Sequence, residues 1–163
     1  MCTIDFLQIT RQPVWLIECE TPIPAGFPRP NDYQRGPRVD LNALLLPNPD
    51  STYLARVTGN SMDGAPAHIA DGALLAIDCS LTPEPGNIVV AAIDGKCTVK
   101  RLEKRGAAYW LVPDNPDYEP LDVGLLGQNF EVWGVVTHTV TSMIKKQTQL
   151  HRAHPPIAVS STL

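Results

Sequence analysis

Short runs of apolar residues, separated by turn-forming residues, cover most of the chain between positions 50 and 140. In several runs apolar and polar positions alternate with a period of two, which is typical of β-strands with one buried face. With no long helical pattern among the runs, we expect this part of the chain to form a compact, mostly β body. The predicted strands span residues 53–58, 73–77, 88–93, 97–102, 109–112 and 130–136.

The dipeptide Asp94-Gly95 separates two of these runs. Both positions tolerate the positive φ that a type I′ turn requires, so the pattern predicts a hairpin in which strand 88–93 pairs with residues 96–103. One short helix is predicted over residues 40–46, because Asp40 can cap its first turn and a proline follows its last residue.

Proline is concentrated in the segment before this body. Residues 13–37 contain six prolines, which prevent a continuous helix and bias each preceding residue toward extended backbone. We therefore expect residues 1–37 to form a mobile extended N-terminal arm and residues 38–143 to form the folded domain. Apolar periodicity is lost after residue 143, which predicts a flexible C-terminal tail over 144–163.

Composition limits the classes of function. A chain of 163 residues with 44% hydrophobic and 18% charged residues is typical of one globular domain. A net charge of -4 produces no general attraction to phosphate backbones, so direct sequence-specific DNA binding is not expected. No stretch reaches the ~20 apolar residues of a membrane span, which predicts a soluble cytoplasmic protein without membrane contact.

The chain has four cysteines, Cys2, Cys19, Cys79 and Cys97, and none of them forms a CxxC pair. No histidine accompanies them at a zinc-like spacing. The pattern therefore indicates neither a metal site nor a disulfide framework, and we expect reduced thiols.

Candidate chemistry begins at Ser61, which lies in the segment Gly59-Asn-Ser-Met-Asp63 directly after a predicted strand. A serine beside glycine at a strand end can be presented on a tight turn, whose backbone N–H groups can form an oxyanion hole. An ordinary turn or cap serine has the same pattern. A nucleophilic role for Ser61 therefore depends on a base close to it.

The four histidines are weak candidates for that base. His151 and His154 fall in the predicted tail, His138 falls in a strand that can display it to solvent, and His68 falls in a loop near Ser61. No G-x-S-x-G sequence is present to support a hydrolase triad.

Lys100 is the other candidate base. Strand alternation places Lys100 on the same face as Thr98 and Leu102, with Arg101 on the opposite face. An ε-amine desolvated by apolar neighbours has a lowered pKa and can act as a neutral base near physiological pH. Spacing alone leaves open the alternative that Lys100 faces solvent in an ordinary amphipathic strand.

Seven sequence blocks between residues 38 and 143 resemble, in order, the peptidase domain shared by LexA, UmuD and phage repressors. The resemblance implies the mostly β fold of that domain, with Ser61 as nucleophile and Lys100 as general base. The backbone N–H groups of Asn60 and Ser61 would then hold the oxyanion, and no metal or organic cofactor would be needed. The blocks are Gly59-Asn-Ser-Met62, Ile69-Ala-Asp-Gly72, Gly86-Asn-Ile-Val-Val-Ala91, Asp94-Gly95, Thr98-Val-Lys-Arg-Leu102, Leu111-Val-Pro-Asp-Asn-Pro116 and Val132-Trp-Gly-Val-Val136.

The N-terminal arm is most similar to the UmuD branch of this family. LexA-like repressors have a helix-turn-helix domain before the peptidase, and the residues before position 25 are too few and too rich in proline for one. The block Ala25-Gly-Phe-Pro-Arg-Pro30 has a UmuD counterpart, and this resemblance implies self-cleavage between Ala25 and Gly26. The flanking prolines favour an accessible extended segment that a protease cleft can bind by strand addition. The alternative is that Ala25 and Gly26 form an ordinary linker turn.

The resemblance also implies a role in the SOS response to DNA damage. A RecA filament on single-stranded DNA would stimulate removal of the arm. The shortened homodimer would then join a UmuC-like Y-family DNA polymerase in translesion synthesis. Two alternatives stay open: a non-catalytic polymerase subunit, and a phage-type regulator that lacks a DNA-binding domain of its own.

Overall fold

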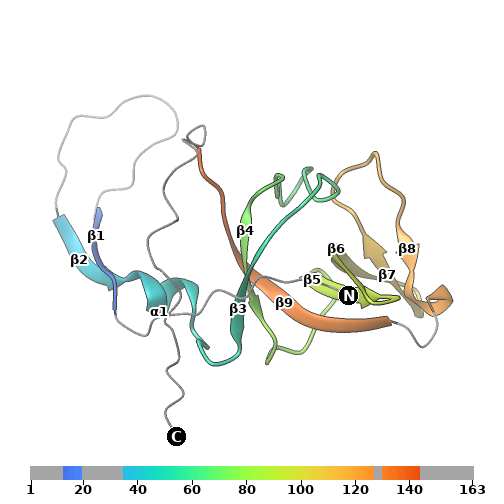
Figure 1. Ribbon diagram of the computed structural model, residues 1–163, viewed down its shortest axis with the longest axis horizontal. Helices are drawn as coiled ribbons and strands as arrows, with labels where there is room; N and C mark the ends of the chain where they lie inside the picture. Colours follow the sequence, from blue (N-terminus) through green and yellow to red (C-terminus); the bar gives the residue numbers. More distant parts are fainter. Residues whose placement is uncertain (1–12, 20–34, 127–129, 144–163) are drawn as a thin grey trace, which may run out of the picture.

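The computed structural model describes residues 13–19, 35–126 and 130–143. Its main body is an antiparallel seven-stranded sheet with the strand order β3-β4-β9-β5-β6-β7-β8 (Figure 1). The expected mostly β fold is thereby confirmed. The strands are β3 (Thr52–Arg56), β4 (Leu74–Asp78), β5 (Ile88–Ile93), β6 (Lys96–Arg105), β7 (Ala108–Val112), β8 (Leu121–Asp122) and β9 (Phe130–Val140).

All six predicted strands are present, and two of them extend several residues beyond the prediction. β6 continues to Arg105 and β9 to Val140, because pairing with neighbouring strands extends them beyond their apolar runs. The predicted hairpin at Asp94-Gly95 is confirmed, since both residues have positive φ and β5 pairs with β6 on either side. The sequence pattern missed β8 and the 3-10 helix η1 (Val123–Leu125), which are too short to show periodicity.

A separate two-stranded sheet consists of β1 (Trp15–Cys19) and β2 (Arg35–Asp40). It leads directly into helix α1 (Leu41–Leu45), and Figure 1 shows both elements on the β3 and β4 side of the main sheet. Asp40 caps α1 as predicted, because its Oδ1 accepts a hydrogen bond from the Asn42 N–H at 3.0 Å. The division of the chain at residues 37 and 143 stays a prediction, and the tail 144–163 lies outside the described residues.

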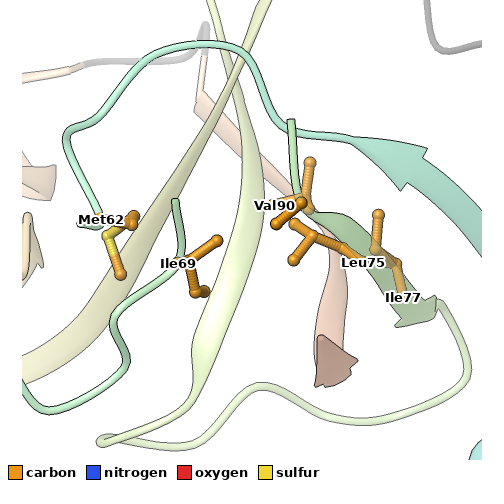
Figure 2. Packing of buried hydrophobic residues seen from close by; sticks show 6 residues of the cluster. Met62, Ile69, Leu75, Ile77 and Val90 are labelled. Atoms are coloured by element: carbon orange, nitrogen blue, oxygen red, sulfur yellow. The ribbon is translucent and has the colours of Figure 1, made fainter. Parts of the chain in front are cut away.

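Two apolar clusters pack against the main sheet. The first joins Met62 and Ile69, from the loop between β3 and β4, to Leu75, Ile77 and Val90 on the strands (Figure 2). The second lies on the opposite face of β5, because adjacent residues of a strand project to opposite faces. Its buried members are Val89, Ala91, Leu102, Leu111 and Val135.

Within the described residues, no helix is long and apolar enough to cross a membrane. Cys79 is a free thiol, whereas Cys97 is disulfide-bonded. The expectation of reduced thiols is therefore wrong for Cys97, because disulfide formation depends on how closely two cysteines approach in the fold and not on their spacing in sequence.

Asp78 is a buried carboxylate at the end of β4, with an exposed fraction of 1%. It accepts hydrogen bonds from the side chains of Asn48 at 2.7 Å, Ser51 at 2.9 Å and Ser80 at 2.7 Å, and from the Ser80 N–H at 2.8 Å. Burial by itself raises the pKa of Asp78, but these hydrogen bonds to the ionised form outweigh burial and lower the pKa from 3.8 to about 2.

We predict that this carboxylate stabilises the fold only in its ionised form. Because the folded pKa lies below the unfolded value, the stabilisation is complete above about pH 4 and is lost as the pH falls through about 2, a change of roughly 2 kcal/mol. Urea unfolding between these pH values will measure it. Asp78→Asn should remove this part of the pH dependence, so equal acid sensitivity in the two proteins would contradict the assignment.

Candidate active site

Ser61 lies on the loop between β3 and β4, and this loop is anchored on both sides of the serine. Before Ser61, the Gly59 N–H donates to Asp71 Oδ1 at 2.8 Å, and Gly59 has a φ of +94°, which favours glycine. After it, Met62 is 1% exposed in the first apolar cluster, and its carbonyl accepts a hydrogen bond from the Ile69 N–H at 2.9 Å. The fold therefore holds the serine in a defined position.

Lys100 lies on β6 directly opposite Val89 of β5. Paired residues of adjacent strands project to the same face, so the lysine side chain shares a face with the second apolar cluster. Its exposed fraction is 8%, and burial lowers the pKa of Lys100 below its ordinary value. The predicted desolvation of Lys100 is confirmed, and the alternative in which it faces solvent is wrong.

Three polar groups surround the amine of Lys100. Its Nζ donates to Ser61 Oγ at 2.8 Å, to the Val99 carbonyl oxygen at 2.8 Å and to Thr98 Oγ1 at 3.0 Å. The structure thus brings together the two residues that the sequence singled out, although 39 positions separate them. Sequence reasoning placed Thr98 on the face of Lys100 but did not assign it this contact.

The segment that follows β7 is hydrogen-bonded to the loop that carries Ser61. The Asn115 N–H donates to the Ser61 carbonyl oxygen at 3.1 Å, and Asn115 Nδ2 donates to the Asn60 carbonyl oxygen at 3.0 Å. The Tyr118 hydroxyl donates to Asn60 Oδ1. Sequence reasoning had noted Asn115 only as part of the block Leu111–Pro116, without a role.

Asp114 connects the same segment to β6. Arg101 Nε and Nη2 donate to the two carboxylate oxygens of Asp114 at 2.8 and 2.6 Å, a bidentate geometry that fixes orientation as well as distance. The Ala67 N–H also donates to Asp114, at 3.1 Å, so the carboxylate holds the loop that follows Ser61. The Asp114 side chain is 3% exposed, which protects these contacts from solvent.

Two of the other candidate bases, His68 and His138, lie among the described residues. No hydrogen bond connects either of these rings to Ser61, and His138 Nδ1 lies 3.2 Å from Thr137 Oγ1. His151 and His154 lie outside the described residues.

The proposed oxyanion donors lie on the Ser61 loop itself. Among the described residues, no hydrogen bond is made by the N–H groups of Asn60 and Ser61, and their role as oxyanion donors stays a prediction. The predicted cleavage site, Ala25 and Gly26, lies outside the described residues, and its place relative to Ser61 stays a prediction.

A mostly β fold that pairs a serine hydroxyl with a desolvated lysine amine is the arrangement expected of a serine peptidase with a lysine base. The family model "Peptidase S24-like" matches residues 17–137, and the chain therefore belongs to the Peptidase S24-like family. This confirms the resemblance to LexA and UmuD peptidase domains that the sequence blocks indicated.

Individual proteins show the same relationship. Protein MucA of Salmonella typhimurium is 39% identical over 118 residues, which cover 72% of this chain and 79% of MucA. Protein ImpA of Salmonella typhimurium is 35% identical over 130 residues, covering 79% of this chain and 83% of ImpA. The LexA repressor of Acidithiobacillus ferrooxidans is 44% identical over 116 residues, covering 70% of this chain and 55% of the repressor.

Gly64 is the point of closest approach between the Ser61 loop and the segment after β7. A Cβ atom at this position would lie 2.1 Å from the Asp114 carbonyl oxygen, a distance at which backbone must move. We predict that Gly64→Ala displaces the loop and lowers the free energy of unfolding by about 1–3 kcal/mol, as overpacking typically does.

Chemical denaturation of matched variants will measure this effect. The control is Gly106→Ala, because Gly106 has a φ of +64° and nothing within 4 Å of an added Cβ, so its cost is backbone strain of about 1–2 kcal/mol without a clash. Equal stability of Gly64→Ala and the unchanged protein would show that the two segments are not in contact.

Proposed function

We propose that this chain is a self-cleaving serine endopeptidase of the SOS response, in which Ser61 and Lys100 cut the N-terminal arm between Ala25 and Gly26. A RecA filament on single-stranded DNA stimulates the cut. The shortened homodimer then acts in the cytoplasm as accessory subunit of a UmuC-like Y-family DNA polymerase in translesion synthesis. The observation that carries the proposal is the 2.8 Å contact between Lys100 Nζ and Ser61 Oγ in a chain of the Peptidase S24-like family.

The geometry around Lys100 suits a neutral base. A neutral amine has two N–H donors and one lone pair, whereas an ammonium has three donors. The Val99 carbonyl can only accept, and the Thr98 hydroxyl oxygen can accept the second N–H. The lone pair of the neutral amine is then left for the Ser61 hydroxyl, which becomes the donor when Lys100 loses its proton.

Acyl transfer follows from this arrangement. Lys100 takes the proton of Ser61 as Oγ attacks the Ala25 carbonyl carbon, and the N–H groups of Asn60 and Ser61 stabilise the oxyanion. The protonated lysine then donates to the departing amine of Gly26. Water hydrolyses the acyl ester on Ser61, with Lys100 again as base, and neither a metal nor an organic cofactor takes part.

The similarity to MucA and ImpA supports the UmuD-type role, because the aligned regions cover more than two thirds of both this chain and each relative. The match to the LexA repressor covers 70% of this chain but only 55% of the repressor, so it supports the chemistry alone. The roles of RecA and of the partner polymerase are inferred from this family relationship.

Incubation with a RecA filament on single-stranded DNA should shorten the chain by its first 25 residues, leaving a product that begins at Gly26. Intact mass measurement identifies the new terminus. Ser61→Ala should stay full-length under the same conditions, because it lacks the attacking oxygen. A new terminus at another residue would refute the assigned cleavage site.

If the unchanged protein also stays intact, the chain is a non-catalytic subunit. The polymerase partnership is tested separately, by co-purification of the shortened protein with the Y-family polymerase of its host. Recovery of a repressor in place of the polymerase would support the phage-type regulator.

Self-cleavage without RecA should accelerate as the pH rises from about 7 to about 10, because Lys100 acts as a base only when it is neutral. Burial lowers the pKa of Lys100 below the reference lysine value of ~10.4, and the neutral fraction increases as the pH approaches the lowered pKa. Rates of product formation across this range test the prediction. With a histidine base, the rate would stop increasing once the pH exceeds the histidine pKa of ~6.5.

Two sets of variants distinguish the bases. Lys100→Arg should be inactive throughout this pH range, since guanidinium keeps its proton, whereas His68→Ala and His138→Ala should remain active. An active Lys100→Arg protein would rule out Lys100 as the base.

A further inference from the structure

We infer that Asn115 is a positioning residue for the nucleophile. Its hydrogen bonds fix the two peptide groups that flank Ser61 and thereby set the direction of both the Ser61 hydroxyl and the Ser61 N–H group. This inference rests on the proposed function and adds a residue to its machinery. Within the described part of the chain, Asn115 makes no hydrogen bond to Lys100 or to the Ser61 hydroxyl.

The two hydrogen bonds of Asn115 reach different peptide planes. Its Nδ2 donates to the Asn60 carbonyl oxygen at 3.0 Å, which belongs to the peptide before the Ser61 Cα. Its backbone N–H donates to the Ser61 carbonyl oxygen at 3.1 Å, which belongs to the peptide after it. Because each peptide is planar, fixing both planes fixes φ and ψ of Ser61 and the direction of its Cα–Cβ bond.

The same contacts orient the proposed oxyanion donor. In a trans peptide the N–H points opposite to the C=O. The Asn60 carbonyl faces Asn115 and also accepts from the Asp63 N–H at 3.0 Å, so the Ser61 N–H faces away from both donors. Hydrogen-bond donors that are oriented before the reaction need not reorient as negative charge develops on the substrate oxygen. This is the condition for an effective oxyanion hole.

Asn115 is itself held in place. It is 8% exposed, and its Oδ1 accepts from the Asp117 N–H at 3.0 Å, which directs the amide nitrogen toward Asn60. Its neighbour Asp114 is locked by the bidentate pair with Arg101. Asparagine suits the position because its side-chain amide can accept a hydrogen bond from one backbone group and donate a hydrogen bond to another.

The test compares Asn115→Ala and Asn115→Asp with Asn48→Ala in the full chain. Asn48 is the matched control: its Nδ2 also donates one side-chain hydrogen bond, to Asp78 Oδ2 at 2.7 Å, and among the described residues no hydrogen bond joins it to Ser61, Lys100 or Asn115. Self-cleavage is measured from pH 7 to pH 10. Labelling of Ser61 by a small fluorophosphonate is measured in parallel, because it reports on the nucleophile without the arm.

Both Asn115 variants should cleave and label about 10²-fold more slowly, the loss expected from a misplaced or missing oxyanion contact. The rate should still rise over the same pH range, because Lys100 is unchanged. Asn48→Ala should stay within about 2-fold of the unchanged protein, as expected of a substitution that perturbs only stability.

Three results would overturn the inference. The first is an Asn115→Ala protein that cleaves and labels like Asn48→Ala. The second is an Asn115→Asp rate that recovers fully at high pH, which would place the effect on the pKa of Lys100. If Asn115→Ala does not fold, Asn115→Asp decides, since it keeps the acceptor for Asp117. The third is an unchanged protein that neither cleaves nor labels, which would contradict the proposed function itself and with it the role of Asn115.

Discussion

The hydrogen bond between Lys100 Nζ and Ser61 Oγ is the interaction on which the site depends, because it must satisfy two opposing conditions. The amine has to be desolvated for its pKa to fall, yet a buried polar group without partners is destabilising. The protein meets the first condition with the apolar face around Val89. It meets the second with acceptors on Thr98, Val99 and Ser61. Two of these acceptors belong to β6 itself, so the strand that positions the lysine also satisfies it.

Both faces of β6 contribute to the site. Lys100 projects to one face and meets the nucleophile directly. The next residue, Arg101, projects to the other face and binds Asp114, whose neighbour Asn115 holds the backbone of Ser61. Base and nucleophile are therefore fixed relative to the same strand, one directly and the other through an ion pair and two hydrogen bonds.

The strands of the main body could be predicted from sequence because each is a local pattern. Period-two alternation and the Asp94-Gly95 turn depend on residues a few positions apart, and the helix cap at Asp40 is equally local. The pairing of β1 with β2 was missed, since it joins segments on either side of a proline-rich stretch. The disulfide of Cys97 was missed as well, because disulfide formation depends on how closely two cysteines approach in the fold.

At the site, the residue types and their places in the sequence pattern indicate which chemistry is possible. The pattern singled out a serine after a strand end and a lysine on a strand face beside apolar residues, and family resemblance joined Ser61 to Lys100. The burial of the Lys100 side chain and the hydrogen bonds of Asn115 to the peptides around Ser61 could be found only in the folded chain. Burial and hydrogen bonding depend on the residues that the fold places beside a given residue. For Lys100 and Asn115 those neighbours are tens of positions away along the chain.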